Sequence, residues 1–443
     1  MMERAFYAGR GIAMQLKLKN IGKISYANIN LNGITVIAGE NNTGKSTVGK
    51  VLHSVFNGFY NFDDKIKNAR ISLFSSVIKK EFDIRYEKFF IDSKQVAISL
   101  FDNSTSVYDE VELEKLIDSN VEFFSFGDND INENFEVTSD FLKFVLDNFY
   151  KYKEISDEQI FINIFNNRIK NVFKSQINNF NTADKGVIEL KIRDKTLEFI
   201  LNNNEVSSIS NMLSLKTQAI YLDNPFILDE WALYYYNNAR IRVKGLQYRR
   251  ELVRKLLSTT GKTEVEEAIA KEVMREKINN VLNKINVVCD GSLSFDFNEG
   301  FSYTGSGSVS LDINNISAGL KTFILIKELL TNGSLEENGT IILDEPEIHL
   351  HPEWQLLFAE IIVLLQKEFN LHILLTTHSP YFIRAIQVYA SKYKISDLCN
   401  YYLSELNKEG SANILDVADN IDRIYSKLST PLQKLEDERW EDD

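Results

Sequence analysis

The chain contains 443 residues, of which 44% are hydrophobic and 26% are charged. At about 150 residues per domain this length predicts two or three structural units, and the composition excludes fibrous, collagen-like and wholly disordered proteins. Lys and Arg number 50 against 63 Asp and Glu, so the net charge of −13 repels nucleic acids and anionic membranes. Any contact with nucleic acid must therefore come from a local basic patch.

The cysteine content and the apolar runs indicate the compartment. The two cysteines, Cys289 and Cys399, fit a reducing compartment and form neither a disulfide framework nor a zinc knuckle. No apolar run approaches the ~18 residues of a membrane span, and the first residues lack the apolar core of a secretory signal. The sequence therefore predicts a cytoplasmic protein without a membrane partner.

Strands and a helix are predicted at the start of the chain. Apolar and polar residues alternate over residues 14–20 and 28–31, and an apolar strand follows over residues 34–38. From Lys45, apolar residues at helical spacing predict a helix that ends near Gly58.

The middle of the chain carries no chemical motif. Residues 61–225 mix strand and helix signals and are interpreted as a variable sheet-edge and insertion region. Residues 226–290 show helical periodicity with many charges and are interpreted as a helical arm or lid.

Strands and helices alternate in the last third of the chain. Helices are predicted over residues 317–330 and 354–369, and apolar strands over residues 341–343 and 371–375. Such alternation predicts an α/β fold with a mostly parallel central sheet. Its core would comprise residues 1–60 and 291–443.

Residues 39–47 read GENNTGKST, which matches G-x-x-x-x-G-K-[ST] between a predicted strand and a predicted helix. In such a loop, backbone amides bind phosphate oxygens, the lysine neutralises phosphate charge and the next hydroxyl ligates Mg²⁺. The motif therefore predicts a nucleoside triphosphate site. Its nucleotide-binding residues would be Asn41, Asn42, Thr43, Gly44, Lys45, Ser46 and Thr47.

Polar residues follow two later apolar strands. Asp344 ends one strand, where it can support Mg²⁺, and Glu345 is suited to polarising an attacking water. His378, after the next strand, could contact the γ-phosphate. His349 and His351 are better explained by structural or nucleotide-sensing roles than by a metal site, because no further Cys or His stands at ligand spacing.

The segment NISAGLK, residues 315–321, precedes a predicted helix. Ser317 and Gly319 could bind an anion at that helix N-terminus, although the pattern is also that of an ordinary N-cap.

These segments and their order resemble the motifs of ATP-binding-cassette-type (ABC-type) ATPases of the SMC/RecF and overcoming-lysogenization-defect group. In chain order they read GENNTGKST, NISAGLK, ILDEP with EIHLHP, and LLTTHSP. The resemblance covers roughly residues 14–60 and 310–385. It implies an ABC-type P-loop NTPase with a mostly parallel central sheet, N-terminal antiparallel strands and a helical arm or lid insertion.

The resemblance also implies roles for residues. ATP and Mg²⁺ would be the cofactors, with Lys45 and Ser46 on phosphate and metal and Asp344 supporting the metal. Glu345 would be the general base, and His378 would be the switch histidine. Ser317 and Gly319 would reach the γ-phosphate bound to a second subunit, which implies a homodimer or a higher oligomer.

This sequence departs from the family pattern in the segment NISAGLK and in one further motif. Ala318 replaces the usual second glycine, and Leu320 stands where Gln or Glu is common. The glutamine of the family's Q-loop is not evident, and Gln218, which lies before a strand-like stretch, is the candidate for it.

A basic run interrupts the acidic chain at residues 240–255. Its basic residues, against the single acid Glu251, are Arg240, Arg242, Lys244, Arg249, Arg250, Arg254 and Lys255. A solvated helix face, a nucleic-acid site and a surface for an acidic partner all remain compatible with this pattern.

The segment after His378 is expected to be too short for the nuclease domain that often follows such an ATPase. The chain thus resembles stand-alone ATPase subunits of bacterial defence systems of the Septu and PARIS types. That resemblance implies an ATP-hydrolysing switch that oligomerises and controls a separate nuclease or toxin in anti-phage defence. The alternatives are a RecF-like DNA-maintenance ATPase and an ATP-binding scaffold with little turnover.

Overall fold

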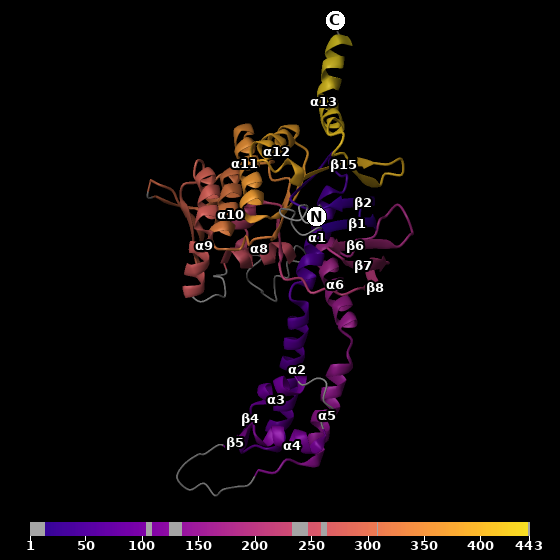
Figure 1. Cartoon of the computed structure of the whole chain (residues 1–443), viewed down its shortest axis with the longest axis vertical. Coiled ribbons are helices and arrows are strands. Elements are labelled where there is room, and N and C mark those ends of the chain that lie inside the picture. The colour runs from indigo at the N-terminus through magenta and orange to yellow at the C-terminus, as the bar shows by residue number, and fades with distance from the viewer. Residues whose placement is uncertain are drawn as a thin grey trace, which may run out of the picture. The chain divides into compact units, whose positions relative to one another are not determined.

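The computed structural model describes residues 14–102, 109–123, 135–232, 247–257, 264–307 and 309–441. They form two compact units (Figure 1). The larger unit takes the chain up to Tyr60 and from Ile164 onward, and the smaller unit takes residues 61–163. All of the motifs identified above lie in the larger unit.

One sheet organises the larger unit. Its strands are β1 (Met14–Ile21), β2 (Ile24–Asn30), β3 (Ile34–Gly39), β6 (Gly186–Ile192), β7 (Lys195–Asn202), β8 (Glu205–Ser210), β9 (Ala219–Leu222), β13 (Thr340–Asp344), β14 (His372–Thr377), β15 (Cys399–Leu406) and β16 (Ala412–Asp416). The 11 strands follow the order β8-β7-β6-β1-β2-β16-β15-β3-β14-β13-β9.

The strands β15, β3, β14, β13 and β9 run parallel to one another. The residues of β3, β13 and β14 are almost all buried, as expected where both faces of a parallel sheet are covered. In register, Asp344 lies beside Thr376, so the carboxyl ends of these strands meet at one edge. The predicted α/β fold class is confirmed.

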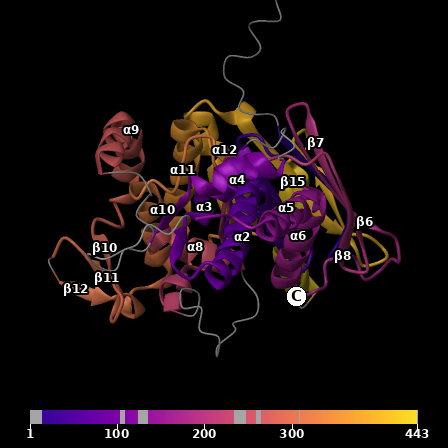
Figure 2. The same cartoon turned by 90° about the horizontal axis from the view of Figure 1, so that it is seen from below.

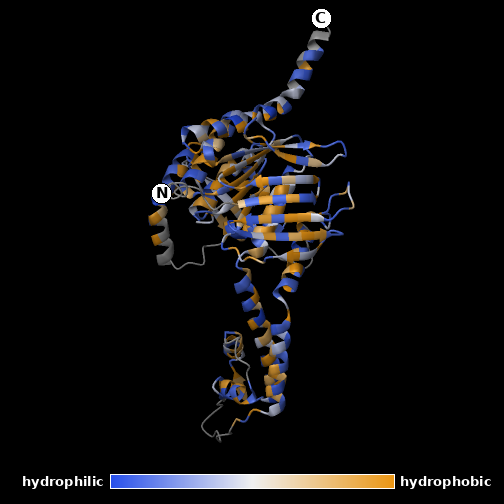
Figure 3. Ribbon diagram, turned by 45° about the vertical axis from the view of Figure 1, so that its right-hand side comes forward, coloured by the Kyte–Doolittle hydropathy of each residue, from blue (hydrophilic) through white to orange (hydrophobic). Residues whose placement is uncertain are grey.

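The strands β1, β2, β6, β7 and β8 extend the sheet in antiparallel pairs. Apolar residues alternate with polar ones along them, which Figure 3 shows as orange and blue bands. β6 to β8 come from the region predicted to contain the sheet edge, and β8 is an edge strand.

Helices cover both faces of the parallel strands. α1 (Lys45–Phe59) packs against β9 and β13 on one face. A large core on the other face joins the sheet to α10 (Ala318–Thr331), α11 (Pro352–Phe369) and α12 (Pro380–Lys392). The remaining elements of this unit are η1 (Pro225–Leu228), β10 (Ser292–Asp296), β11 (Gly300–Thr304), β12 (Ser310–Asp312), η2 (Ile313–Asn315), η3 (Ser396–Leu398) and α13 (Asp422–Glu441).

Much of the described part of residues 226–290, interpreted above as an arm or lid, packs into this core instead. α8 (Gln247–Leu257) and α9 (Glu264–Ile285) bury Leu252, Val253 and Val281 in the same cluster as α10 and α11. α9, α10 and α11 lie side by side (Figure 2). Apolar residues of α8 and of the carboxyl half of α9 thus form the inner face of core helices, whereas Ile269 and Val273 in the first half of α9 are exposed.

The smaller unit explains why the region 61–225 does not behave as one piece. Its elements are α2 (Phe62–Arg85), β4 (Phe89–Ile91), α3 (Ser93–Asp102), α4 (Glu110–Asp118), β5 (Val121–Phe123) and α5 (Ser139–Glu154), with the start of α6 (Asp157–Phe173). They bury a core of their own that includes Phe74, Phe82, Phe141 and Phe149. The smaller unit therefore has its own core, whereas the strands β6 to β9, later in the chain, belong to the larger unit.

None of the helices in the described part of the chain combines the length and the apolar character that crossing a membrane requires.

Candidate nucleotide-binding site

The glycine-rich loop joins the carboxyl end of β3 to the start of α1. Gly44 has φ 84°, and a Cβ there would lie 3.0 Å from Ile24 Cγ1, so the loop conformation requires glycine. The hydroxyl of Thr43 donates to the Glu40 carbonyl at 2.8 Å. Within the described residues, no side chain caps the N-terminus of α1. The N-terminus of α1 is therefore open to phosphate oxygens.

Lys45 lies beneath this loop and is buried. Its Nζ donates to the carbonyl oxygens of Gly39 and Glu40, both at 2.9 Å. The same Nζ lies 3.3 Å from Oε1 of Glu345. The ammonium group is therefore held between the loop and the end of β13, where it can meet a phosphate.

Ser46 and Asp344 approach each other as the motifs predicted. The Ser46 hydroxyl donates to Oδ1 of Asp344 at 2.9 Å. A hydroxyl beside a carboxylate provides the hard oxygen ligands that Mg²⁺ prefers, with other positions left to phosphate and water. The residues present thus fit Mg²⁺ with a triphosphate.

Glu345 has an unusual backbone conformation for a residue with a side chain. Its φ is 51°, in the left-handed region. The Glu345 N–H donates to the carbonyl and to the hydroxyl oxygen of Thr376, both at 3.1 Å. These hydrogen bonds stabilise the left-handed conformation. The carboxylate consequently lies between Lys45 and His378.

His378 completes the cluster at the end of β14. Its Nδ1 lies 3.5 Å from Oε2 of Glu345 and 3.8 Å from Oε1 of Glu347. Glu347 is buried and accepts hydrogen bonds from the Thr377 hydroxyl and from the His378 N–H. Burial raises the pKa of this carboxyl group. Lys45, Ser46, Asp344, Glu345 and His378 therefore share one site.

The other predicted loop residues take supporting positions. Asn41 and Asn42 are exposed, and Asn42 has φ 62°. The Thr47 N–H donates to the Gly44 carbonyl at 3.0 Å. These residues shape the loop around Lys45.

Ser317 and Gly319 lie at a different place, the N-terminus of α10. Ser317 accepts a hydrogen bond from the Leu320 N–H at 3.4 Å, so it is the N-cap of this helix. A Cβ on Gly319 would lie 2.8 Å from the His349 carbonyl. In the described residues, no hydrogen bond or ion pair joins either residue to the loop 39–47. One subunit alone therefore does not bring the two motifs together.

His349 and His351 have structural contacts. The His349 ring lies edge-on against Phe226, with centroids 5.5 Å apart. His351 Nδ1 accepts from the Glu353 N–H at 3.4 Å at the start of α11.

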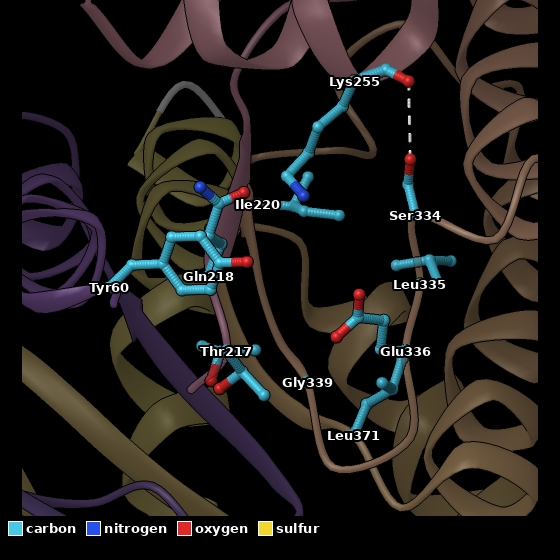
Figure 4. Close-up of a pocket in the computed structure, with 11 residues that line it drawn as sticks. Tyr60, Thr217, Gln218, Ile220, Lys255, Ser334, Leu335, Glu336, Gly339 and Leu371 are labelled. Carbon is cyan, nitrogen blue, oxygen red and sulfur yellow. Dashed lines mark hydrogen bonds between the residues drawn. The ribbon is translucent and has the colours of Figure 1, made fainter. Parts of the chain in front are cut away.

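Gln218 lies at the wrong end of the sheet for the role suggested above. It precedes β9, whereas the nucleotide site lies where the parallel strands end. Gln218 lines a pocket together with Lys255 and Glu336, as Figure 4 shows, and Thr340 also lines it. A glutamine before a strand cannot reach the γ-phosphate, because parallel strands carry their ligands at the carboxyl ends.

The basic run is only partly accessible. Arg240, Arg242 and Lys244 lie outside the described residues. Of the four basic residues on α8, only Arg254 is exposed. Arg249 pairs with Asp223 at 2.9 Å, and burial lowers the pKa of Lys255. Arg250 is half-buried. Within the described residues 247–255, the basic side chains therefore do not form a continuous surface, because the helix turns part of them inward.

A buried polar network lies at the other end of α1. Glu251 on α8 accepts from Arg168 on α6 at 2.7 Å and from Asn57 on α1 at 2.6 Å. The His53 ring lies 3.2 Å from the same carboxylate. Burial lowers the pKa of His53 despite this carboxylate. One carboxylate thus joins three helices.

The structure adds site residues that the motifs did not single out. Tyr221 donates to Oδ2 of Asp344 at 2.7 Å, and Thr376 donates to its Oδ1 at 2.5 Å. Thr376 and Glu347 stood inside the quoted segments LLTTHSP and EIHLHP and could have been noticed there. Tyr221 carried no signal in the linear sequence, since its role depends on the pairing of β9 with β13.

Comparison with known proteins agrees with this geometry. The profile of a family described as "AAA ATPase domain" matches residues 14–383. The chain belongs to this ATPase family. The match spans the glycine-rich loop, Asp344, Glu345 and His378, and it confirms the relationship to ATPases that the motifs indicated.

Two curated relatives are similar to parts of the chain. "Retron Ec83 probable ATPase" of Escherichia coli is 29% identical over 172 residues, which cover 32% of this chain and 31% of that protein. "Retron Vc95 probable ATPase" of Vibrio cholerae serotype O1 biovar El Tor is 36% identical over 81 residues, or 16% and 15%. The matched part spans less than a third of either relative's length.

Solved structures of SMC heads are also similar. The SMC head domain from Thermotoga maritima has a TM-score of 0.38 and 11% identity and covers 91% of this chain and 98% of its own. The Smc head domain with an extended coiled coil from Pyrococcus furiosus has a TM-score of 0.40 and 9% identity, with 96% and 99% covered.

Proposed function

We propose that this ATPase-family protein binds ATP with Mg²⁺, hydrolyses it, oligomerises through its ATP sites and thereby controls a separate nuclease or toxin in anti-phage defence. One observation supports the catalytic part. The side chains of Lys45, Ser46, Asp344, Glu345 and His378 converge at the carboxyl ends of β3, β13 and β14.

Each of these residues has a role in the proposed reaction. Lys45 and the α1 amides would bind the phosphates, and Ser46 with Asp344 would hold Mg²⁺, which neutralises charge between the β- and γ-phosphates. Glu345, held between Lys45 and His378, would orient the attacking water and accept its proton. His378 would contact the γ-phosphate and change position when that group leaves.

The place of Ser317 supports the proposed oligomer. It is exposed at the N-terminus of α10, in a segment without a polar contact to the loop 39–47 in the described residues. We infer that it meets the nucleotide bound by a second copy of the chain, head to tail. Each dimer would then enclose two nucleotides.

The proposed control of an effector rests on two supports. Both curated relatives are named as probable ATPases of retrons. The sequence also resembles ATPase subunits of defence systems in which a separate chain acts as the effector.

Co-purification with the products of neighbouring genes tests this proposal. Wild type, Lys45→Ala and Glu345→Gln are compared with and without ATP, and Lys50→Ala, a second lysine on α1, is the matched control. We expect a nuclease or toxin to be retained by wild type and Lys50→Ala. Its retention should change in Lys45→Ala and Glu345→Gln. An absence of any partner, or equal retention in all four proteins, would contradict the proposed control.

A RecF-like DNA-dependent ATPase is the second candidate, supported by the exposed Arg254. DNA should then stimulate turnover in a salt-dependent way, and Arg254→Glu should weaken the stimulation. Arg249→Glu is unsuitable for this test, because Arg249 pairs with Asp223 inside the protein.

The third candidate, a scaffold with little turnover, is suggested by Ala318 and Leu320. Measured ATP turnover by the wild-type oligomer distinguishes it from the other two.

A further inference from the structure

The carboxylate of Asp344 is surrounded by hydroxyl groups from three different elements. Ser46 on α1 and Thr376 on β14 donate to Oδ1 at 2.9 and 2.5 Å. Tyr221 on β9 donates to Oδ2 at 2.7 Å. Ser46 belongs to the predicted metal site, whereas Tyr221 and Thr376 come from the strands on either side of β13.

Packing fixes the Tyr221 ring. The residue is 1% exposed. A Cβ on Gly49 of α1 would lie 2.9 Å from its Cε2, so the helix backbone presses against one part of the ring. The rings of Tyr248 and His53 lie at centroid distances of 4.6 and 6.0 Å. The phenol can therefore deliver its hydroxyl only in one direction, toward the end of β13.

The Tyr221 hydroxyl is the donor in its contact with Asp344, since a carboxylate oxygen accepts. A hydrogen bond from a hydroxyl to a carboxylate is among the strong ones in proteins.

We propose that Tyr221 and Thr376 are positioning residues that clamp the Asp344 carboxylate so that its Oδ1 faces Ser46, where Mg²⁺ would bind. Tyr221 on β9 donates to Oδ2, and Thr376 on β14 restrains Oδ1. This inference rests on the proposed Mg²⁺-dependent ATP binding.

Removing either hydroxyl should weaken the metal site more than the phosphate site. Groups that orient a metal ligand typically contribute 10- to 100-fold in metal affinity. Neither hydroxyl belongs to the loop amides or to Lys45, which hold the phosphates. The two positioning residues should therefore change the Mg²⁺ requirement and leave metal-free nucleotide binding intact.

A binding titration separates these effects without measuring turnover. The affinity of the full chain for a fluorescent ATP analogue is first measured in EDTA. It is then measured at increasing Mg²⁺ concentrations until the affinity for the analogue no longer rises. Tyr221→Phe and Thr376→Val are compared with wild type. Tyr248→Phe is the matched control, since this neighbouring tyrosine is 2% exposed and its hydroxyl donates to Asp223.

We expect Tyr221→Phe and Thr376→Val to raise the half-saturating Mg²⁺ concentration by about tenfold or more. Affinity in EDTA should stay within about twofold in all variants, and Tyr248→Phe should match wild type in both readings. Thr376→Val tests the clamp from the opposite strand if Tyr221→Phe fails to fold, as checked by its melting curve.

The outcomes overturn different statements. An unchanged Mg²⁺ requirement in the folded variants, or an equal shift in Tyr248→Phe, would overturn the clamp. Wild-type protein that binds the analogue without any effect of Mg²⁺, or does not bind it, would instead overturn the proposed function.

Discussion

The two ends of the parallel strands differ in how they use polar residues. At the carboxyl ends, Asp344 and Glu345 are each in contact with several partners. At the amino ends, Thr340 begins β13 with a buried hydroxyl that has no hydrogen-bond partner among the described residues, and His372 begins β14 in a buried position. The same strands thus place a reactive cluster at one edge and ordinary core at the other, as open parallel sheets do.

The largest expected effect is on turnover at the carboxyl ends. Glu345→Gln removes the proposed general base and should lower ATP turnover by about 10² to 10⁴-fold. Nucleotide binding should persist, because Lys45 and the loop amides are unchanged. Gln218→Ala, at the amino end of β9, is the control and should keep wild-type turnover in the same phosphate-release assay. Equal losses of ATP turnover in Glu345→Gln and Gln218→Ala would contradict the proposed difference between the two ends of the strands.

The next effect concerns stability beside the carboxyl end of β9. Arg249→Glu replaces a paired, largely buried cation with an anion that faces Asp223 and Glu230. Breaking such a pair costs about 3 to 5 kcal/mol, measured as the free energy of unfolding in denaturant. The exposed Arg254 offers the comparison, and Arg254→Glu should change stability by less than about 0.5 kcal/mol. Similar losses in the two variants would show that α8 is not oriented as described.

Two threonines provide a smaller and more direct comparison. Thr340→Val replaces an unpartnered buried hydroxyl with a methyl group, so stability should stay the same or rise by about 1 kcal/mol. Thr376→Val removes a hydrogen bond to a carboxylate and should cost about 1.5 to 3 kcal/mol. Denaturant unfolding of both variants measures the difference, and a loss of stability in Thr340→Val would show that its hydroxyl has a partner.

The smallest expected effect is a pH dependence at the amino end of β14. Burial lowers the pKa of His372 from about 6.5, although its hydrogen bond with the Leu31 carbonyl acts in the opposite direction. The unfolded chain therefore binds a proton first as pH falls below 6.5, so stability decreases from there toward the folded-state pKa.

Melting temperatures between pH 8 and pH 5 measure this dependence. His372→Asn should show a shallower decrease than wild type, whereas His351→Asn, at an exposed N-cap, should follow wild type. If the melting temperature of His372→Asn decreases with pH as steeply as that of wild type, His372 does not cause the pH dependence.

The sequence predicted the parts of the site whose spacing determines their geometry. A glycine-rich loop between strand and helix positions Lys45 and Ser46 locally, and an apolar strand that ends in Asp344 and Glu345 positions both carboxylates. The family match bears out the ATPase relationship. The exact partners of Asp344 could not be predicted, because Tyr221 reaches it only through the pairing of β9 with β13.

Composition was a weaker guide than spacing. The basic run predicted a charged surface, yet helical geometry turned Arg249 toward Asp223. Gln218 was the candidate for the glutamine of the family pattern, but it precedes β9 and therefore lies at the opposite end of the parallel strands from the phosphate loop. Likewise, the helical periodicity of residues 226–290 was interpreted as an arm, whereas apolar residues of α8 and α9 lie in the core. The missing information was which side of a helix faces its neighbours for the basic run and for residues 226–290, and which way the strand runs for Gln218.

The network around Glu251 has a consequence for how this chain can evolve. The Glu251 carboxylate contacts Arg168 on α6 and both Asn57 and His53 on α1, and these helices are far apart in the sequence. A neutral substitution at Glu251 would leave a buried arginine without its counter-charge, a change that is strongly destabilising by itself. Lineages that lose this glutamate should therefore also have replaced the arginine, so that two distant positions are inherited as a pair.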